Sequence, residues 1–286
     1  MLELFFNPKR AERKPWQMFF VGLLYASLSI FLAYLMFGKN PVLSQYMGVL
    51  VITFCVIFTM PFVYYTIKLE ERKNIEYEEE GKLLKEHSRA VFVFIWLFLG
   101  FVVAFSFWHM VLPDGPNLLN AQIKTFCQIN QHSNYANCLK QYGLDSTSGI
   151  TGNVTSKERF FSIFANNINV MIFTLLLSLI FGAGAVFVLA WNASVIAAAI
   201  GIFAKSQISQ IPMGLGRYMI HGIPEIAAYF IAALAGGILS IAVIRRDLNK
   251  EHFWAIMQDS LNLLLIAIVI LFVSAIIEVF ITPKLF

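Results

Sequence analysis

The sequence predicts an all-α fold, a polytopic transmembrane bundle of about seven spans in which one crossing is short or re-entrant. Composition is the first observation behind this prediction. Hydrophobic residues make up 58% of the 286-residue chain and charged residues 13%, about half the charged fraction typical of a soluble domain. The second observation is that several uncharged runs reach the roughly 20 residues that a helix needs to cross a bilayer. The lipid bilayer is therefore the first expected partner.

Seven apolar runs are the expected helices, in the following order: 18–37, 42–67, 90–112, 160–190, 193–204, 224–244 and 261–281. Six of them are long enough to cross the membrane. The run at 193–204 is too short for an ordinary span, which favours a short crossing or a re-entrant segment. The first run lacks a small-residue cleavage site and is expected to remain as an anchor.

Charge placement predicts the orientation, because basic residues near span ends tend to stay in the cytoplasm. The basic cluster at 9–14 and the charged segments 68–89 and 245–251 are therefore expected on the cytoplasmic side. An even number of crossings must separate the last two segments, so the short run has to cross. We expect a multi-pass protein of the cell membrane with a cytoplasmic amino terminus, an extracytoplasmic carboxyl terminus and an extracytoplasmic loop at 113–159.

The cytoplasmic segment 68–89 mixes glutamates with lysines and arginines. Charge pairs along helix faces favour a solvated helical extension of the second and third spans. A docking site for a soluble partner is the alternative interpretation.

Two of the three cysteines, Cys127 and Cys138, lie in the long outer loop. An oxidising exterior would allow a disulfide between them, and two isolated thiols are the alternative. Cys55 lies in the second span, where a small buried apolar role is expected.

Polar side chains are predicted to gather in the outer leaflet. The topology places these residues at one depth: Asn166, Asn167, Asn169, His221, Glu225 and Glu278. Pro224 is expected at the first position of a helix, with His221 in the preceding loop and Glu225 in the first turn. Intramembrane ionisable groups usually face a bundle interior or a wet cavity. Two interpretations stay open: the groups pair and fix the packing of the spans, or they form a transport or ion site.

Small residues predict close helix packing near this cluster. A row with a period of four runs along the sixth span, and two glycines interrupt the fourth: Ala228, Ala232, Gly236 and Ser240, then Gly182 and Gly184. Such rows let helix backbones approach closely inside a membrane. The row is expected to pack against the fourth or seventh span, or to form a homodimer seam.

Several function classes lack their motifs in this sequence. It contains no H-E-x-x-H pattern, no G-x-S-x-G elbow and no phosphate-binding loop, which are strong signatures of zinc proteases, serine hydrolases and nucleotide-driven motors. No long basic tract suggests nucleic acid. We therefore expect no enzyme activity, no metal, no cofactor and no nucleic-acid partner.

Four short stretches carry a resemblance to a known family. They are "FANNINV" from Phe164, "HGIPE" from His221, a cytoplasmic "RRD" from Arg245 and "IEVFITP" from Ile277, together with Asn192 at an expected inner turn. Over about residues 88–286 the chain resembles the stage II sporulation protein M family. The form of these stretches points, by the same resemblance, towards an archaeal relative.

The resemblance implies a five-span core at 88–286, to which residues 1–87 add a two-span hairpin with the charged cytoplasmic loop. In sporulating bacteria the family provides a membrane subunit of an engulfment complex with two peptidoglycan-degrading partners, and it has no established catalytic activity. The expectation is a non-enzymatic scaffold or anchor for a membrane or cell-envelope assembly, with membrane or envelope proteins as partners. A transporter or channel with a polar site in the outer leaflet is the alternative.

Overall fold

A computed structural model of the chain describes residues 7–40, 42–76, 80–112, 118–130, 138–139, 156–181, 185–204, 207–244 and 250–285. Within these ranges the regular structure is helical, with no strand. Seven of the helices described there are long and apolar enough to cross a membrane by length and composition. The predicted fold class is therefore confirmed. Most of the predicted outer loop and of the charged segment at 245–251 lies outside the described residues.

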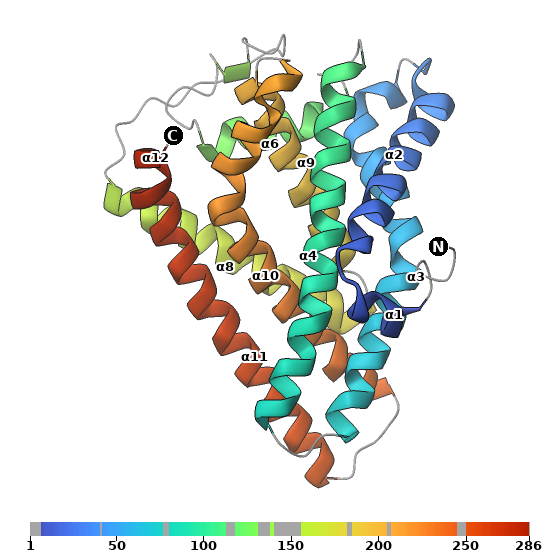
Figure 1. The fold of residues 1–286 in the computed structure, drawn as a ribbon, viewed down its shortest axis with the longest axis vertical. Coiled ribbons are helices and arrows are strands. Elements are labelled where there is room, and N and C mark those ends of the chain that lie inside the picture. Colours follow the sequence, from blue (N-terminus) through green and yellow to red (C-terminus); the bar gives the residue numbers. More distant parts are fainter. Residues whose placement is uncertain are drawn as a thin grey trace.

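The helices follow one another as α1 Pro8–Arg13, α2 Gln17–Phe37, α3 Met47–Glu76, α4 Glu80–Val111, α6 Asn120–Asn130, α8 Ser156–Phe181, α9 Ala185–Ala204, α10 Ile211–Ile244, α11 Lys250–Ile276 and α12 Thr282–Leu285. A π-helical turn at Ile277–Ile281 joins α11 to α12. Figure 1 shows α6 and α12 at one end of the bundle, called here the α12 end, and the lower ends of α3 and α4 at the other, the α3–α4 end.

Helix α4 is central, with most of its apolar span buried between α2, α9 and α10. It approaches α2 closely, because a Cβ added to Gly22 would meet the carbonyl oxygen of Leu97, and one added to Gly100 would meet the backbone of α2. On another face Phe94 stacks on Phe230 of α10, with 4.6 Å between the ring centroids. Glycines and stacked rings thus provide the close packing that membrane helices need.

The break between the fourth and fifth spans differs from the prediction. It was expected at 190–193, whereas α8 ends at Phe181 and α9 begins at Ala185. Helix α9 consequently has 20 residues, an ordinary span length rather than a short or re-entrant crossing. Gly182 and Gly184 lie between the two helices and outside the described residues. Each glycine disfavours a helix by about 1 kcal/mol, a signal that the unbroken apolar run conceals.

The prediction that Pro224 begins a helix was wrong. Helix α10 runs through Pro224 without a break from Ile211 to Ile244. Proline has no N–H, so the carbonyl oxygen of Ile220, four residues before it, loses its helical donor. In that turn the Ser274 hydroxyl of α11 donates to the carbonyl oxygen of His221 over 2.8 Å. The hydroxyl thus donates to the carbonyl next to the one that lost its donor, and polar side chains from neighbouring helices help membrane helices to tolerate proline.

The charged segment at 68–89 is helical at both ends, as expected, but part of it is buried. The exposed fractions of Glu70, Lys73 and His87 are only 0%, 8% and 2%. Lys73 Nζ lies 2.7 Å from Glu70 Oε1 and 2.8 Å from Glu12 Oε2, and His87 Nδ1 lies 2.7 Å from Glu70 Oε2. The solvated interpretation is wrong for these residues, because tertiary contact with α1 and α4 covers them.

Cys127 on α6 and Cys138 form a disulfide, with 5.9 Å between their Cα atoms. Cys55 is a buried free thiol on α3. Of the two alternatives for the outer-loop cysteines, the structure has the bonded one.

Candidate functional site

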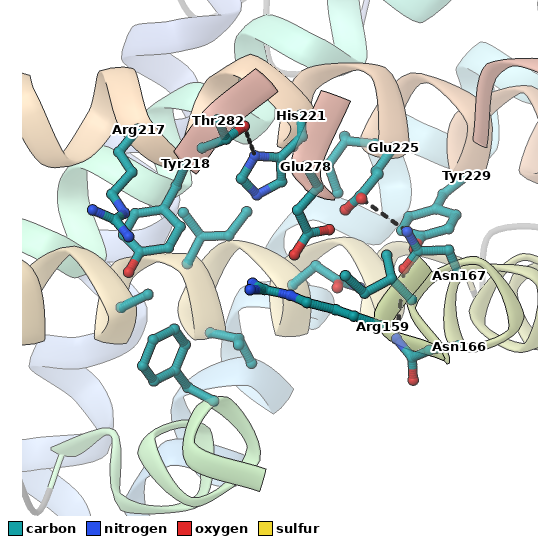
Figure 2. A pocket seen from close by; sticks show the side chains of 18 of the residues that line it. Arg159, Asn166, Asn167, Arg217, Tyr218, His221, Glu225, Tyr229, Glu278 and Thr282 are labelled. Carbon is teal, nitrogen blue, oxygen red and sulfur yellow. Dashed lines mark hydrogen bonds between the residues drawn. The ribbon is translucent and has the colours of Figure 1, made fainter. Parts of the chain in front are cut away.

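A polar pocket of about 350 Å³ opens at the α12 end. Its lining comes from α6, α8, α9, α10 and the carboxyl-terminal turns, and its polar members are Arg159, Asn166, Asn167, Asn192, Arg217, Tyr218, His221, Glu225, Tyr229, Glu278 and Thr282. Figure 2 shows side chains of this lining around the pocket, which we call the α12 pocket.

Glu225 is the centre of a hydrogen-bond network across three helices. The Asn167 amide of α8 donates to Glu225 Oε1 over 2.8 Å. The Ser274 hydroxyl of α11 lies 3.3 Å from the same oxygen. The Tyr229 hydroxyl donates to Asn167 Oδ1 over 3.0 Å. Buried polar groups need such partners where water is absent, so the network ties α8, α10 and α11 together.

The unbroken course of α10 determines which of its side chains face the pocket. His221, Glu225 and Tyr229 are spaced by four residues, so a continuous helix presents them on one face. All three line the α12 pocket. The expected separation into a loop histidine and a glutamate in the first helical turn is therefore corrected.

Glu278 reaches the pocket from the π-helical turn at Ile277–Ile281. The Thr282 hydroxyl that follows this turn donates to the Ile277 carbonyl oxygen over 3.2 Å. His221 Nδ1 lies 3.3 Å from the same Thr282 oxygen. Single π-helical turns are rare overall, but those that occur are often found at functional sites. This one carries a carboxylate that Figure 2 shows pointing into the pocket.

The charged groups in the described lining of the pocket are balanced in number, with two arginines and two glutamates. Arg159 is exposed at the start of α8, and Figure 2 shows its side chain reaching toward the space in front of Glu278. The Arg217 guanidinium lies 5.4 Å from the ring centroid of Phe203, within cation–π range. The pocket therefore offers both guanidinium and carboxyl groups to a ligand.

Helix α6 contributes an aromatic side chain to the pocket. Phe126, next to the disulfide-bonded Cys127, lines the α12 pocket and meets Tyr218 edge to face, with 6.2 Å between the ring centroids. The disulfide therefore lies beside the pocket wall.

The structure brings together five of the six residues of the expected polar cluster: Asn166, Asn167, His221, Glu225 and Glu278. Asn169 is exposed and does not line the pocket. It follows Asn167 by two residues, which turns its side chain about 200° around the helix. Its expected place in the cluster is therefore corrected.

Asn192 was expected at an inner turn, yet it lies inside α9, seven residues after Ala185 and twelve before Ala204. Its amide donates to the Val188 carbonyl oxygen over 2.7 Å, and it lines the pocket. The pocket therefore reaches the middle of a membrane-spanning helix.

The small-residue row of α10 packs inside the chain. Ala228 and Ala232 are fully buried and Ser240 is 4% exposed. A Cβ added to Gly236 would lie 2.7 Å from the carbonyl oxygen of Leu175 on α8. Of the alternatives left open, the row packs against the fourth span, and the burial of Ala228 and Ala232 leaves these side chains no surface for a homodimer seam.

Several residues of the site were not predicted from the sequence, among them Arg159, Tyr218, Tyr229, Ser274 and Thr282. A polar spacing of four would have found three of them. Tyr229 follows Glu225 by four residues, and Ser274 and Thr282 lie four residues before and after Glu278. Arg159 lies at the start of α8 and carries no comparable signal.

The carboxylates and the histidine of the pocket do not form a candidate metal centre. Among the described residues, no group of three or more His, Cys, Asp or Glu side chains is arranged to hold a metal ion.

Comparison of the chain with models of known protein families identifies one family that matches it. The model of the family described as stage II sporulation protein M matches residues 89–283. The chain belongs to the stage II sporulation protein M family. It is also similar to the uncharacterized protein MJ0793 of Methanocaldococcus jannaschii, with 34% identity over 131 residues, which cover 44% of this chain and 72% of the relative. No solved structure matches the chain.

The α12 pocket lies entirely within the segment that matches the stage II sporulation protein M family, because its lining residues run from Phe126 to Pro283. Helices α1, α2 and α3 precede that segment. The candidate site therefore belongs to the family part of the chain.

Proposed function

We propose that this chain is a non-enzymatic multi-pass membrane protein that anchors a membrane or cell-envelope assembly, with the α12 pocket as the recognition site for a partner protein. The observation that carries the proposal is the network around Glu225. It joins Asn167 of α8 and Ser274 of α11 to α10.

A fixed network suits an anchor. Interhelical hydrogen bonds in a membrane contribute about 0.6 kcal/mol each on average, and they hold three helices in one arrangement around the pocket. A site whose shape is fixed before binding loses less conformational entropy when a partner docks. The network therefore supports a preformed recognition surface.

The hydroxyl groups near His221 support a role without catalysis. Nucleophilic catalysis needs a hydroxyl whose proton is taken by a neighbouring base. The Ser274 hydroxyl donates to the His221 carbonyl oxygen, and the Thr282 hydroxyl donates to the Ile277 carbonyl oxygen. Each hydroxyl thus has a backbone carbonyl oxygen as an acceptor, at 2.8 Å for Ser274 and 3.2 Å for Thr282.

In this proposal the α12 end faces the outside of the cell, as charge placement predicts. The disulfide between Cys127 and Cys138 supports this orientation, because disulfides form and persist in oxidising surroundings. Partners would then be envelope proteins or membrane proteins with an outer segment, in line with the family's role in sporulating bacteria.

Photo-crosslinking from the pocket rim tests the proposal. A photoreactive residue at Asn166, which lines the pocket, is expected to give a discrete protein adduct in native membranes. The matched control is Phe161 on the same helix, which is 67% exposed and outside the pocket. Lipid adducts alone at both positions, or the same protein adduct at both, would contradict a partner site in the α12 pocket.

A solute pathway is the second candidate, and the depth of the pocket favours it. Transport sites usually lie near the membrane midplane, and the pocket reaches Asn192 in the middle of α9. An alternating-access transporter would expose a cysteine at Asn192 to a polar thiol reagent from each side in turn. An anchor would expose it from the α12 end only.

A further inference from the structure

A second cavity, of about 660 Å³, opens at the α3–α4 end of the chain. Its lining is strongly basic and comes from α1, α3 and α4: Lys9, Glu12, Arg13, Leu69, Arg72, Lys73 and Arg89. Five cationic side chains thus accompany one carboxylate in the described lining. We call this cavity the basic pocket.

The basic pocket is held by the buried charges beneath it. Lys73 Nζ lies 2.9 Å and 2.8 Å from the two carboxylate oxygens of Glu12, which fixes α1 on α3. Glu70 contacts both Lys73 and His87, which fixes α3 on α4. Because Lys73 engages the carboxylate of Glu12, the positive charge that a ligand meets comes mainly from Lys9, Arg13 and Arg72.

The ends of the apolar spans predict that the basic pocket lies at the depth of lipid headgroups. Arg13 lies four residues before α2 begins, and Arg72 lies two residues after the second apolar span ends. Arg89 lies two residues after the third span begins. Trp16, which is 51% exposed, stands between Arg13 and the first span, as aromatic side chains do at membrane interfaces.

We propose that the basic pocket binds the phosphate group of an anionic membrane lipid. The planar guanidinium groups of Arg13 and Arg72 match phosphate oxygens in pairs. Basic pockets between membrane helices on the cytoplasmic side are suited to phosphate headgroups, and that is the side on which charge placement puts this end. The inference does not depend on the proposed function, because the two pockets lie at opposite ends of the bundle.

Lipid binding to the purified full-length chain in uncharged detergent tests the proposal. The probes are phosphatidylglycerol, phosphatidylcholine and inorganic pyrophosphate, and native mass spectrometry measures the bound fraction. Phosphatidylglycerol is expected to bind in preference to the other two. Arg13→Gln with Arg72→Gln should weaken its binding roughly tenfold or more, since two charge-assisted contacts are lost.

The matched control is Lys14→Gln with Lys68→Gln, which removes two positive charges from the same end without touching the pocket lining. It should leave binding nearly unchanged. Equal weakening by both double variants would overturn the proposal in favour of diffuse charge attraction. Binding of pyrophosphate alone would overturn the lipid assignment in favour of a soluble phosphate. If the arginine double variant fails to fold, Arg13→Gln alone must still weaken binding more than Lys14→Gln alone.

Discussion

The Asn167 amide of α8 donates a hydrogen bond to the Glu225 carboxylate of α10, with 2.8 Å between Nδ2 and Oε1. The same asparagine accepts the Tyr229 hydroxyl through its other polar atom. One side chain thus satisfies two polar groups of the neighbouring helix, and both lie in the wall of the α12 pocket.

Asn167→Ala should destabilise the bundle. It removes a donor from Glu225 and the acceptor of Tyr229, and leaving buried polar groups without partners costs roughly 1–3 kcal/mol. Denaturation in mixed detergent micelles measures the loss in free energy of unfolding. Asn169→Ala is the matched control, because Asn169 is exposed on the same helix. Equal losses for the two variants would refute the structural role of the contact.

Two glycines of α10 should respond differently to an added methyl group. At Gly236 a Cβ would lie 2.7 Å from the Leu175 carbonyl oxygen, and this backbone atom has to move. At Gly222 the nearest atoms are side-chain ends of Ile196 and Met219 at 3.5 Å and 3.6 Å, an ordinary contact. Gly236→Ala should therefore lower the thermal unfolding temperature in detergent, and Gly222→Ala should not. The opposite order would contradict the packing of α8 against α10.

Glu12 should make stability depend on pH. Burial, aided by the Glu70 carboxyl and opposed by Lys73, raises the pKa of Glu12 from 4.5 to about 7. The folded chain then holds a proton that the unfolded chain releases between these values, so the free energy of unfolding falls as pH rises from 4.5 to about 7. Glu12→Gln removes this contribution. A difference between variant and wild type that stays constant across the window would contradict the raised pKa.

The cysteines give a prediction that a thiol count checks. The chain has three cysteines, and the disulfide leaves Cys55 as the free thiol. Denatured protein should therefore expose one reactive thiol before reduction and three after it. Three thiols without reduction would show that Cys127 and Cys138 are not bonded in the membrane.

Hydropathy predicted six spans by length, and charge placement required the seventh, short run to cross. The structure has seven helices that are long and apolar enough to cross a membrane. Span number was predictable because it depends on composition over long windows. Helix ends depend on local features that hydropathy does not register. The apolar run across Gly182 and Gly184 hid the end of α8, and Pro224 suggested a helix start at a point where α10 is continuous.

The depth of the polar cluster was also predictable, whereas its direction around each helix was not. Asn167 and Asn169 share a depth, yet only Asn167 faces the pocket. The buried contact between Glu12 and Lys73 joins residues 61 positions apart, and no local pattern reports a pairing at that distance. Packing between helices that are distant in the sequence therefore determines which side chains face the pocket and which charged groups pair.

The central claim is that the Glu225 network holds the bundle around a recognition site rather than conducting a solute. Purified wild type and Glu225→Gln, each reconstituted into vesicles, provide the most direct measurement through ion and solute flux alongside unfolding stability. We expect no flux above protein-free vesicles for either protein, and Glu225→Ala, which removes the oxygen that accepts from Asn167 and Ser274, should lower the unfolding stability. Flux through the wild type that Glu225→Gln abolishes while the fold stays intact would contradict it.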